Sequence, residues 1–188
     1  MSKVDLRLKG LMMISVIMAV VDVSVGCLLT FYLKFSTKLA AVIIGTVILL
    51  HGMYHLIRYI YDGLGKKVFA VNLITAVINV ILGIFTIVYP FSSINHLGIM
   101  FGIYLLGNAY EKGFYGWKLM KKQDASYPIV CFLAFLLVFM GVLVMFNPFK
   151  GFMLSTKLSG LFMVCSGVFE AMICKLFFDK SDVLLKMF

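Results

Sequence analysis

The chain has 188 residues, of which 63% are hydrophobic and only 13% are charged, whereas soluble domains are roughly 45–50% apolar and 25% charged. A chain of this length buries only about 70% of its unfolded surface, so the surplus apolar area has to face lipid. The net charge of +9 does not indicate a nucleic-acid partner, because Lys and Arg lie at the ends of apolar runs, where they fit a membrane topology better. The composition therefore predicts an integral membrane protein whose main partner is the lipid bilayer.

Six apolar segments are long enough to cross a bilayer as helices, which takes about 20 residues each. They are residues 11–33, 39–61, 68–89, 94–117, 127–146 and 151–178. Short connections join the two segments of each successive pair, and polar, basic joints separate the pairs. The sequence thus predicts an all-α integral membrane protein with one membrane domain over 1–188. We expect three tight helical hairpins, at 11–61, 68–117 and 127–178, followed by a short cytoplasmic tail at 179–188.

The positive charges predict the orientation. Of the 17 Lys and Arg residues, 13 lie at the N-terminus, at the two joints between hairpins and near the C-terminus, and the remaining four lie at the hairpin tips. Cytoplasmic loops of membrane proteins carry an excess of Lys and Arg. Both termini are therefore expected in the cytoplasm.

An internal repeat underlies the three hairpins. Four positions recur at intervals of 7, 12 and 7 residues: Gly83, Pro90, Gly102 and Ala109 in the middle copy, Gly141, Pro148, Gly160 and Gly167 in the last, and Gly26, Leu33, Gly45 and Gly52 in the first. Proline ends a helix at a tip, where water can satisfy the backbone. The glycines, together with Gly98, allow close helix approach in lipid. Each copy crosses twice, so the repeats are parallel and related by an axis along the membrane normal. Either a closed pseudo-threefold bundle or an unclosed row fits this pattern.

Polar residues in the middle of the apolar segments are the first candidates for function, because charges there are costly. Asp22 lies near the middle of the first segment, and His51, Asn79 and Asn108 lie at similar depth in the next three. Asp22 and Asn79 share one repeat position, where the third copy has Leu137. We expect these four polar residues to form an interior network. A protonated or hydrogen-bonded aspartate that holds helices together and a proton or ion relay are the two interpretations of Asp22.

A second polar set lies nearer the expected cytoplasmic side. His55, Lys112 and Glu170 each follow the last small repeat position by three residues, and Glu111 precedes Lys112. Pseudo-threefold packing would bring them together so that their charges neutralise. Solvated or snorkelling side chains are the alternative, which suits Lys112 best. Arg58 is expected to set topology rather than to pair with this set.

The sequence gives little support for a metal site, a cofactor or an enzyme. His51 and His55 have helical metal-ligand spacing, but only Asp22 is an obvious third donor, and neither an HExxH motif nor a cysteine pair is present. The chain also lacks a phosphate loop and a dinucleotide fingerprint. We therefore expect no metal, no cofactor and no catalytic residue.

The repeat resembles that of the HdeD-like family of bacterial acid-resistance membrane proteins. The residues that carry the resemblance are Gly83, Pro90, Gly102 and Glu111 in the middle copy and Gly141, Pro148, Gly160, Gly167 and Glu170 in the last. The first copy departs from the pattern, with Leu33 in place of proline and His55 where the last copy has Glu170. The resemblance implies a six-helix inner-membrane protein linked to acid stress, with no established reaction and no active site.

Three functions remain open at this level. The leading one is a non-enzymatic protein with an acid or envelope stress role through proton or small-solute handling around Asp22 and His51. The second is a small transporter or channel, and the third is an assembly subunit that binds a membrane-protein partner or a second copy of the chain. A continuous hydrated path past Asp22 would favour a transporter, and small-residue faces exposed to lipid would favour an assembly subunit.

Overall fold

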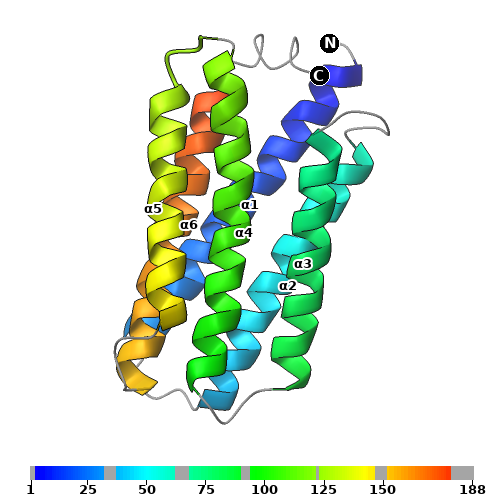
Figure 1. The fold of residues 1–188 in the computed structure, drawn as a ribbon. Coiled ribbons are helices and arrows are strands. Elements are labelled where there is room, and N and C mark those ends of the chain that lie inside the picture. The colour runs from blue at the N-terminus through cyan, green and yellow to red at the C-terminus, as the bar shows by residue number, and fades with distance from the viewer. Residues whose placement is uncertain are drawn as a thin grey trace.

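The computed structural model describes residues 3–31, 37–61, 68–89, 94–121, 123–146 and 152–178, which contain six α-helices (Figure 1). These are α1 (Lys3–Phe31), α2 (Thr37–Tyr61), α3 (Val68–Val88), α4 (Ile94–Lys121), α5 (Tyr127–Phe146) and α6 (Phe152–Phe178). The helices coincide with the six predicted segments, except that α1 begins earlier and α4 ends later. Leu33, Pro90, Pro148 and the predicted tail at 179–188 lie outside the described residues.

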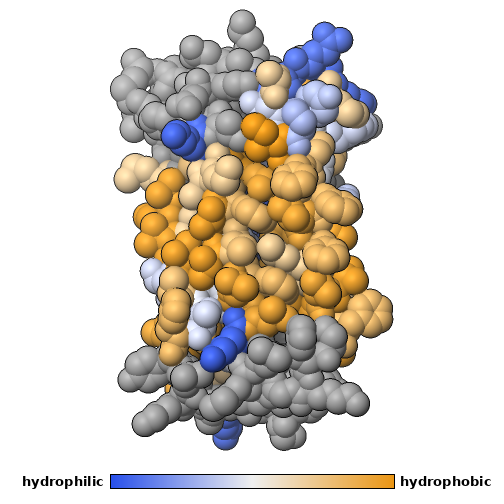
Figure 2. Space-filling view, turned by 90° about the vertical axis from the view of Figure 1, so that its left-hand side faces the viewer, coloured by the Kyte–Doolittle hydropathy of each residue, from blue (hydrophilic) through white to orange (hydrophobic). Residues whose placement is uncertain are grey.

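The six described helices form a long bundle whose outer surface is apolar. Four contain stretches that are long and apolar enough to cross a membrane: Met13–Phe31, Lys38–Ile60, Tyr127–Phe146 and Thr156–Lys175. The described part of α3 contributes a shorter apolar stretch, Asn72–Val88. Figure 2 shows apolar side chains covering the middle of one face, with hydrophilic ones toward the ends. This distribution is that of a multi-pass membrane protein.

The most extensive helix contacts join neighbouring repeats. α2 packs most closely with α3, α4 with α5, and α1 with α6, whereas the two helices of each hairpin contact each other less. The tight packing expected within each hairpin therefore lies between hairpins instead. Because α6 also packs on α1, the three repeats form a closed ring, which excludes the unclosed row.

The repeated glycines explain this pairing. A methyl group added at Gly26 of α1 would lie 2.6 Å from the carbonyl oxygen of Gly160 in α6. The same construction at Gly102 gives 2.8 Å to the carbonyl oxygen of Gly141, and at Gly45 it gives 3.2 Å to that of Gly83. Each contact joins the first glycine of one repeat to the second glycine of its neighbour. Three equivalent contacts around the ring give the bundle its pseudo-threefold symmetry.

The remaining repeat glycines also lie where two helices meet. Added methyl groups would lie 2.7 Å from the backbone nitrogen of Val80 at Gly52, 2.8 Å from the Ala19 carbonyl oxygen at Gly167, and 2.9 Å from the Val144 carbonyl oxygen at Gly98. These close contacts supply the van der Waals packing that drives helix association in lipid, where apolar side chains gain little by leaving the solvent.

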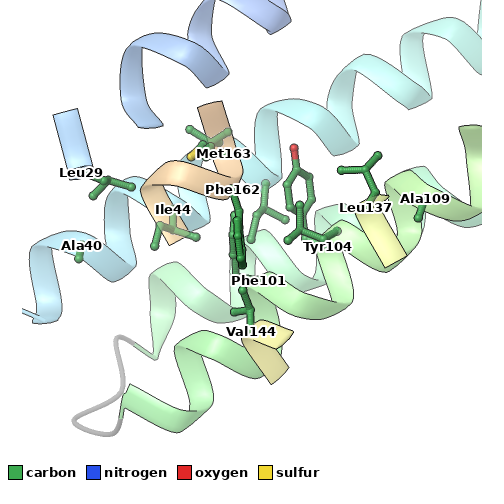
Figure 3. Packing of buried hydrophobic residues seen from close by; sticks show 13 residues of the cluster. Leu29, Ala40, Ile44, Phe101, Tyr104, Ala109, Leu137, Val144, Phe162 and Met163 are labelled. Carbon is green, nitrogen blue, oxygen red and sulfur yellow. The ribbon is translucent and has the colours of Figure 1, made fainter. Parts of the chain in front are cut away.

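The second helices of the repeats, α2, α4 and α6, supply the centre of the bundle. We call the end where α1 begins and α6 ends the terminal end, and the opposite end the hairpin end (Figure 1). Six large apolar side chains fill the centre toward the hairpin end and form the apolar layer: Ile44, Ile48, Phe101, Leu105, Phe162 and Met163. Figure 3 shows several of them in contact range across the three helices. The interior toward the terminal end is polar.

The turn between α4 and α5 has a left-handed residue that is not glycine. Gln123 has φ 54°, and its N–H donates to the Met120 carbonyl while the Asp124 N–H donates to the Leu119 carbonyl, at 3.0 and 3.1 Å. This is a Schellman helix end, where glycine is the usual residue.

Replacing Gln123 with glycine is expected to stabilise the protein by about 1 kcal/mol, because the left-handed backbone costs an L-residue about that much. Denaturant titration in detergent would measure the gain. Gln123→Ala keeps the strained backbone and serves as the control, which we expect to stay near wild type. Equal stability of both variants would contradict this account of the turn.

Candidate functional site

The centre of the bundle holds a buried acid–base pair at mid-depth. Asp22 of α1 and His51 of α2 are 1% and 4% exposed, and the His51 Nε2 lies 3.5 Å from the Asp22 Oδ2. On the opposite side of the His51 imidazole, the Nδ1 atom lies 3.3 Å from the Val47 carbonyl oxygen, one turn earlier in the helix. That carbonyl favours a proton on Nδ1, which leaves Nε2 to exchange a proton with Asp22.

The helices that surround Asp22 hold it in a closed position. Gly167 of α6 packs against Asp22, since a methyl group there would lie 2.9 Å from the Asp22 Cβ. The Tyr104 ring of α4 packs edge-on against the His51 ring with 5.4 Å between centroids. Four helices therefore meet around this acid–base pair.

The structure places the two asparagines at similar depth but does not join them to Asp22. Asn79 and Asn108 are both buried, and the Asn79 Oδ1 lies 3.9 Å from where a Gly107 methyl would be, so its amide faces α4. Asn79 therefore approaches the second helix of its own repeat, as Asp22 approaches His51. Of the four residues of the predicted network, the described structure joins Asp22 and His51 by an ion-pair contact. It shows no contact that joins Asn79 or Asn108 to this pair.

The second polar set is assembled toward the terminal end. The His55 Nε2 lies 3.4 Å from the Glu111 Oε2, and Arg58 donates to the Glu111 Oε1 at 3.1 Å. Arg58 also lies over the Tyr115 ring, 5.2 Å from its centroid. The expectation that Arg58 does not pair with this set was wrong, because Arg58 lies one helical turn past His55 and reaches the same carboxylate.

Lys112 and Glu170 form the shortest ion pair in this set. The Lys112 Nζ lies 2.7 Å from the Glu170 Oε2, and the Ser15 hydroxyl donates to the Glu170 Oε1 at 2.8 Å. Lys112 is buried, so the alternative of a snorkelling side chain does not hold for it. The four predicted residues form two adjacent ion-paired groups, one around Glu111 and one around Glu170.

The charges of the interior do not balance without a titratable proton. Of the three interior carboxylates among the described residues, Glu111 has Arg58 and Glu170 has Lys112. Asp22 has a histidine as its ion-pair partner. With neutral histidines, the set therefore carries one unmatched negative charge, which sits on Asp22.

Three residues that line the interior were missed from the sequence, although the repeat contains a signal for two of them. Ser15 precedes Asp22 by seven residues, and Asn72 precedes Asn79 by the same interval; both are buried. Extending the repeat by one more position would have found Ser15 and Asn72. Tyr104 carries no such signal, because a tyrosine on an apolar helix is ordinarily an interfacial or packing residue.

Metal-ligating groups are sparse in the described part of the chain. No group of three or more His, Cys, Asp or Glu residues there could hold a metal ion. The four cysteines are free, and His51 and His55 each turn to a carboxylate on a different helix. The described interior therefore contains ion pairs and a carboxylate–histidine pair.

Comparison with known proteins identifies the repeat. A family described as a short repeat of unknown function (DUF308) matches residues 17–85, 74–146 and 132–182. The three matches begin at the same distance before Gly26, Gly83 and Gly141, so they have the register of the glycine repeat. No curated protein and no solved structure matches significantly. The three matches together span most of the chain, which belongs to the DUF308 short-repeat family, the family that includes the HdeD-like proteins.

Proposed function

We propose that this protein is a non-enzymatic, six-span protein of the bacterial inner membrane that binds and releases a proton at Asp22 and His51 during acid or envelope stress. We place both termini in the cytoplasm, because most Lys and Arg residues lie at the N-terminus, at the joints between hairpins and near the C-terminus of the sequence. The family match and the apolar exterior support a membrane protein of this class. The acid-stress role rests on the resemblance to HdeD-like proteins together with the chemistry of the site.

The pairing of Asp22 with a histidine carries this proposal. Glu111 and Glu170 are each neutralised by a permanently charged partner, whereas Asp22 is neutralised only when a proton resides on it or on His51. A carboxylate without a compensating charge near mid-bilayer costs several kcal/mol. Proton occupancy of this pair and stability of the bundle are therefore linked, which is the property required of a protein that responds to acid.

The interior packing weighs against a transporter or channel. On the hairpin side of Asp22, the apolar layer fills the centre with side chains such as Phe101 and Leu105, both 0% exposed. Such packing does not leave a hydrated path across the described part of the bundle. In a channel, by contrast, polar residues would line a pore that continues through the whole bundle.

The placement of the glycines weighs against an assembly subunit. The repeat glycines that the structure describes are buried between helices of one chain, so these small-residue faces are used internally and are not offered to lipid. Self-association, or association with another membrane protein, stays a prediction, and it would have to use surfaces other than these glycine faces.

Replacing Asp22 with asparagine tests the proposal. Asn79 occupies the equivalent position in the second repeat, so Asp22→Asn is expected to insert and fold normally. The variant removes the titrating carboxyl, so we expect it to abolish survival of acid challenge by cells that depend on this protein.

Asn79→Leu is the matched control, because the third repeat has Leu137 at that position. It alters a buried polar group of the same depth without a change of titratable charge, and acid survival should be retained. Full acid survival with Asp22→Asn, at wild-type protein levels, would remove Asp22 from the mechanism.

A further inference from the structure

We propose that the bundle binds water against Asp22 and Tyr104, and that this internal water connects with the terminal end but not with the hairpin end. This inference takes its physiological meaning from the proposed role of Asp22. To that role it adds two points: water is the ligand that brings the proton to Asp22, and the proton comes from the terminal end.

Unsatisfied polar atoms mark where the water binds. Among the described residues, the Tyr104 hydroxyl and both Asp22 carboxylate oxygens are buried without a well-formed hydrogen bond, and Asn108 is the polar side chain near enough to interact with the Tyr104 hydroxyl. The 3.5 Å separation from the His51 Nε2 is an ion-pair distance and is too long for a well-formed hydrogen bond. In the view of Figure 3, the Tyr104 hydroxyl oxygen is directed away from the Phe101 ring.

Water is the ligand that fits these atoms. Leaving a buried donor or acceptor unsatisfied costs about 1–3 kcal/mol for each group, and proteins ordinarily meet that cost with buried water that makes two to four hydrogen bonds. The Tyr104 side chain and the Asp22 carboxylate both adjoin His51, and together they offer a hydroxyl donor and two carboxylate oxygens as partners. The His51 ring packs against Tyr104 and lies next to Asp22, which brings these atoms around one place.

The terminal side of the site continues the polar path. The Asn72 Nδ2 and the His55 Nδ1 are also buried without a partner among the described residues. Asn72 accepts a hydrogen bond from the Tyr115 hydroxyl at 3.3 Å, and Glu170 accepts one from Ser15. Polar groups on α1, α2, α3, α4 and α6 therefore occupy the interior between Asp22 and the terminal end.

The hairpin side of the site is closed by the apolar layer. The three inner helices run in the same direction, and each passes from apolar to polar residues at the same step of the repeat: from Ile48 to His51, from Leu105 to Asn108, and from Met163 to Ser166. All six residues are buried. Ser159, at the repeat position of Ile44 and Phe101, is a buried polar residue on this side. The apolar Phe162 and Met163 follow it on α6 before the polar residues begin, and an apolar space of this kind stays dry. The contrast between the two sides makes the access one-sided.

Radiolytic hydroxyl-radical labelling of the full chain in detergent micelles tests the water site. Radicals form from water, so buried side chains are oxidised only where water is bound. Tyr104 and Phe101 are both 0% exposed and their rings stack at 5.8 Å, which makes Phe101 a matched internal control. We expect oxidation of Tyr104 and protection of Phe101 and of Met163, although methionine is intrinsically the more reactive side chain. Protection of Tyr104, or oxidation of Met163, would overturn the inference.

Infrared spectroscopy of oriented proteoliposomes tests the side of access. An external acid step should raise the protonated carboxyl band within seconds when the terminal end faces outward, and not when the hairpin end does. The band should be absent from Asp22→Asn. A response of equal rate in both orientations, or from the hairpin end alone, would overturn one-sided access while leaving the proposed proton role standing. Loss of that role would instead appear as unchanged acid survival of Asp22→Asn, whatever the labelling of Tyr104.

Discussion

Replacing Lys112 with methionine is expected to destabilise the protein by about 3–5 kcal/mol, because removal of one partner of a buried ion pair leaves the other charge uncompensated. The Lys112 Nζ lies 2.7 Å from Glu170, and the two side chains are only 6% and 16% exposed. In the variant, Glu170 retains the Ser15 hydroxyl as a hydrogen-bond donor, but a hydroxyl does not neutralise its charge. SDS titration of the detergent-solubilised protein, followed by circular dichroism, would measure the loss.

The double variant Lys112→Met/Glu170→Leu is the decisive control. An apolar pair in place of a buried ion pair is often neutral or stabilising, so we expect most of the lost stability to return. The coupling energy from this double-mutant cycle isolates the pair from other effects of each substitution. A double variant less stable than either single variant would show that Lys112 and Glu170 contribute through separate contacts.

Replacing Gly26 with alanine is expected to destabilise the contact between α1 and α6 by about 1–3 kcal/mol, as overpacking of a tight interior does. The added methyl would lie 2.6 Å from the Gly160 carbonyl oxygen and 2.7 Å from the Val164 backbone nitrogen. Both are backbone atoms, so neither can move aside without shifting a helix. The thermal unfolding midpoint in detergent should fall accordingly.

Gly113→Ala provides a matched control within a helix of the same bundle. A methyl group there would meet the Ala134 Cβ at 3.9 Å, which is ordinary contact. Alanine exceeds glycine in helix propensity by about 1 kcal/mol, so this variant should be at least as stable as the wild type. A similar loss of stability in both variants would show that the effect of Gly26→Ala does not come from the α1–α6 contact.

Much of the fold could be predicted from the sequence because membrane spans have a strong compositional signature. The helices follow the predicted apolar segments, and the 7, 12 and 7 spacing of the glycines agrees with the register of the family matches. It was harder to predict which helices pack against each other. A short connection such as that before α4 suggests a close pair, but in lipid the contact goes to the face with glycine, and Gly83 and Gly102 face helices of other repeats.

The candidate site could also be predicted only in part. The depth of a polar residue can be counted along its helix, and that count placed Asp22 and His51 in one layer. It could not say that His51 faces Asp22 while Asn79 faces α4, because the direction of a side chain depends on how neighbouring helices are rotated. The pairing of Arg58 with Glu111 and the place of Tyr104 beside His51 were missed for the same reason, since each depends on contacts with other helices.

The contact between α1 and α6 also bears on the biosynthesis of the protein. The ribosome makes α1 first and α6 last, and no connecting loop holds the two together. Throughout translation, α1 lies in the bilayer without its principal partner, and Asp22 lacks the Gly167 face that covers it. The ring can close, and Asp22 can become enclosed, only after α6 has been made. A copy that lacks α6 would therefore leave the Asp22 carboxyl group without this cover inside the membrane, where an uncompensated charge is costly.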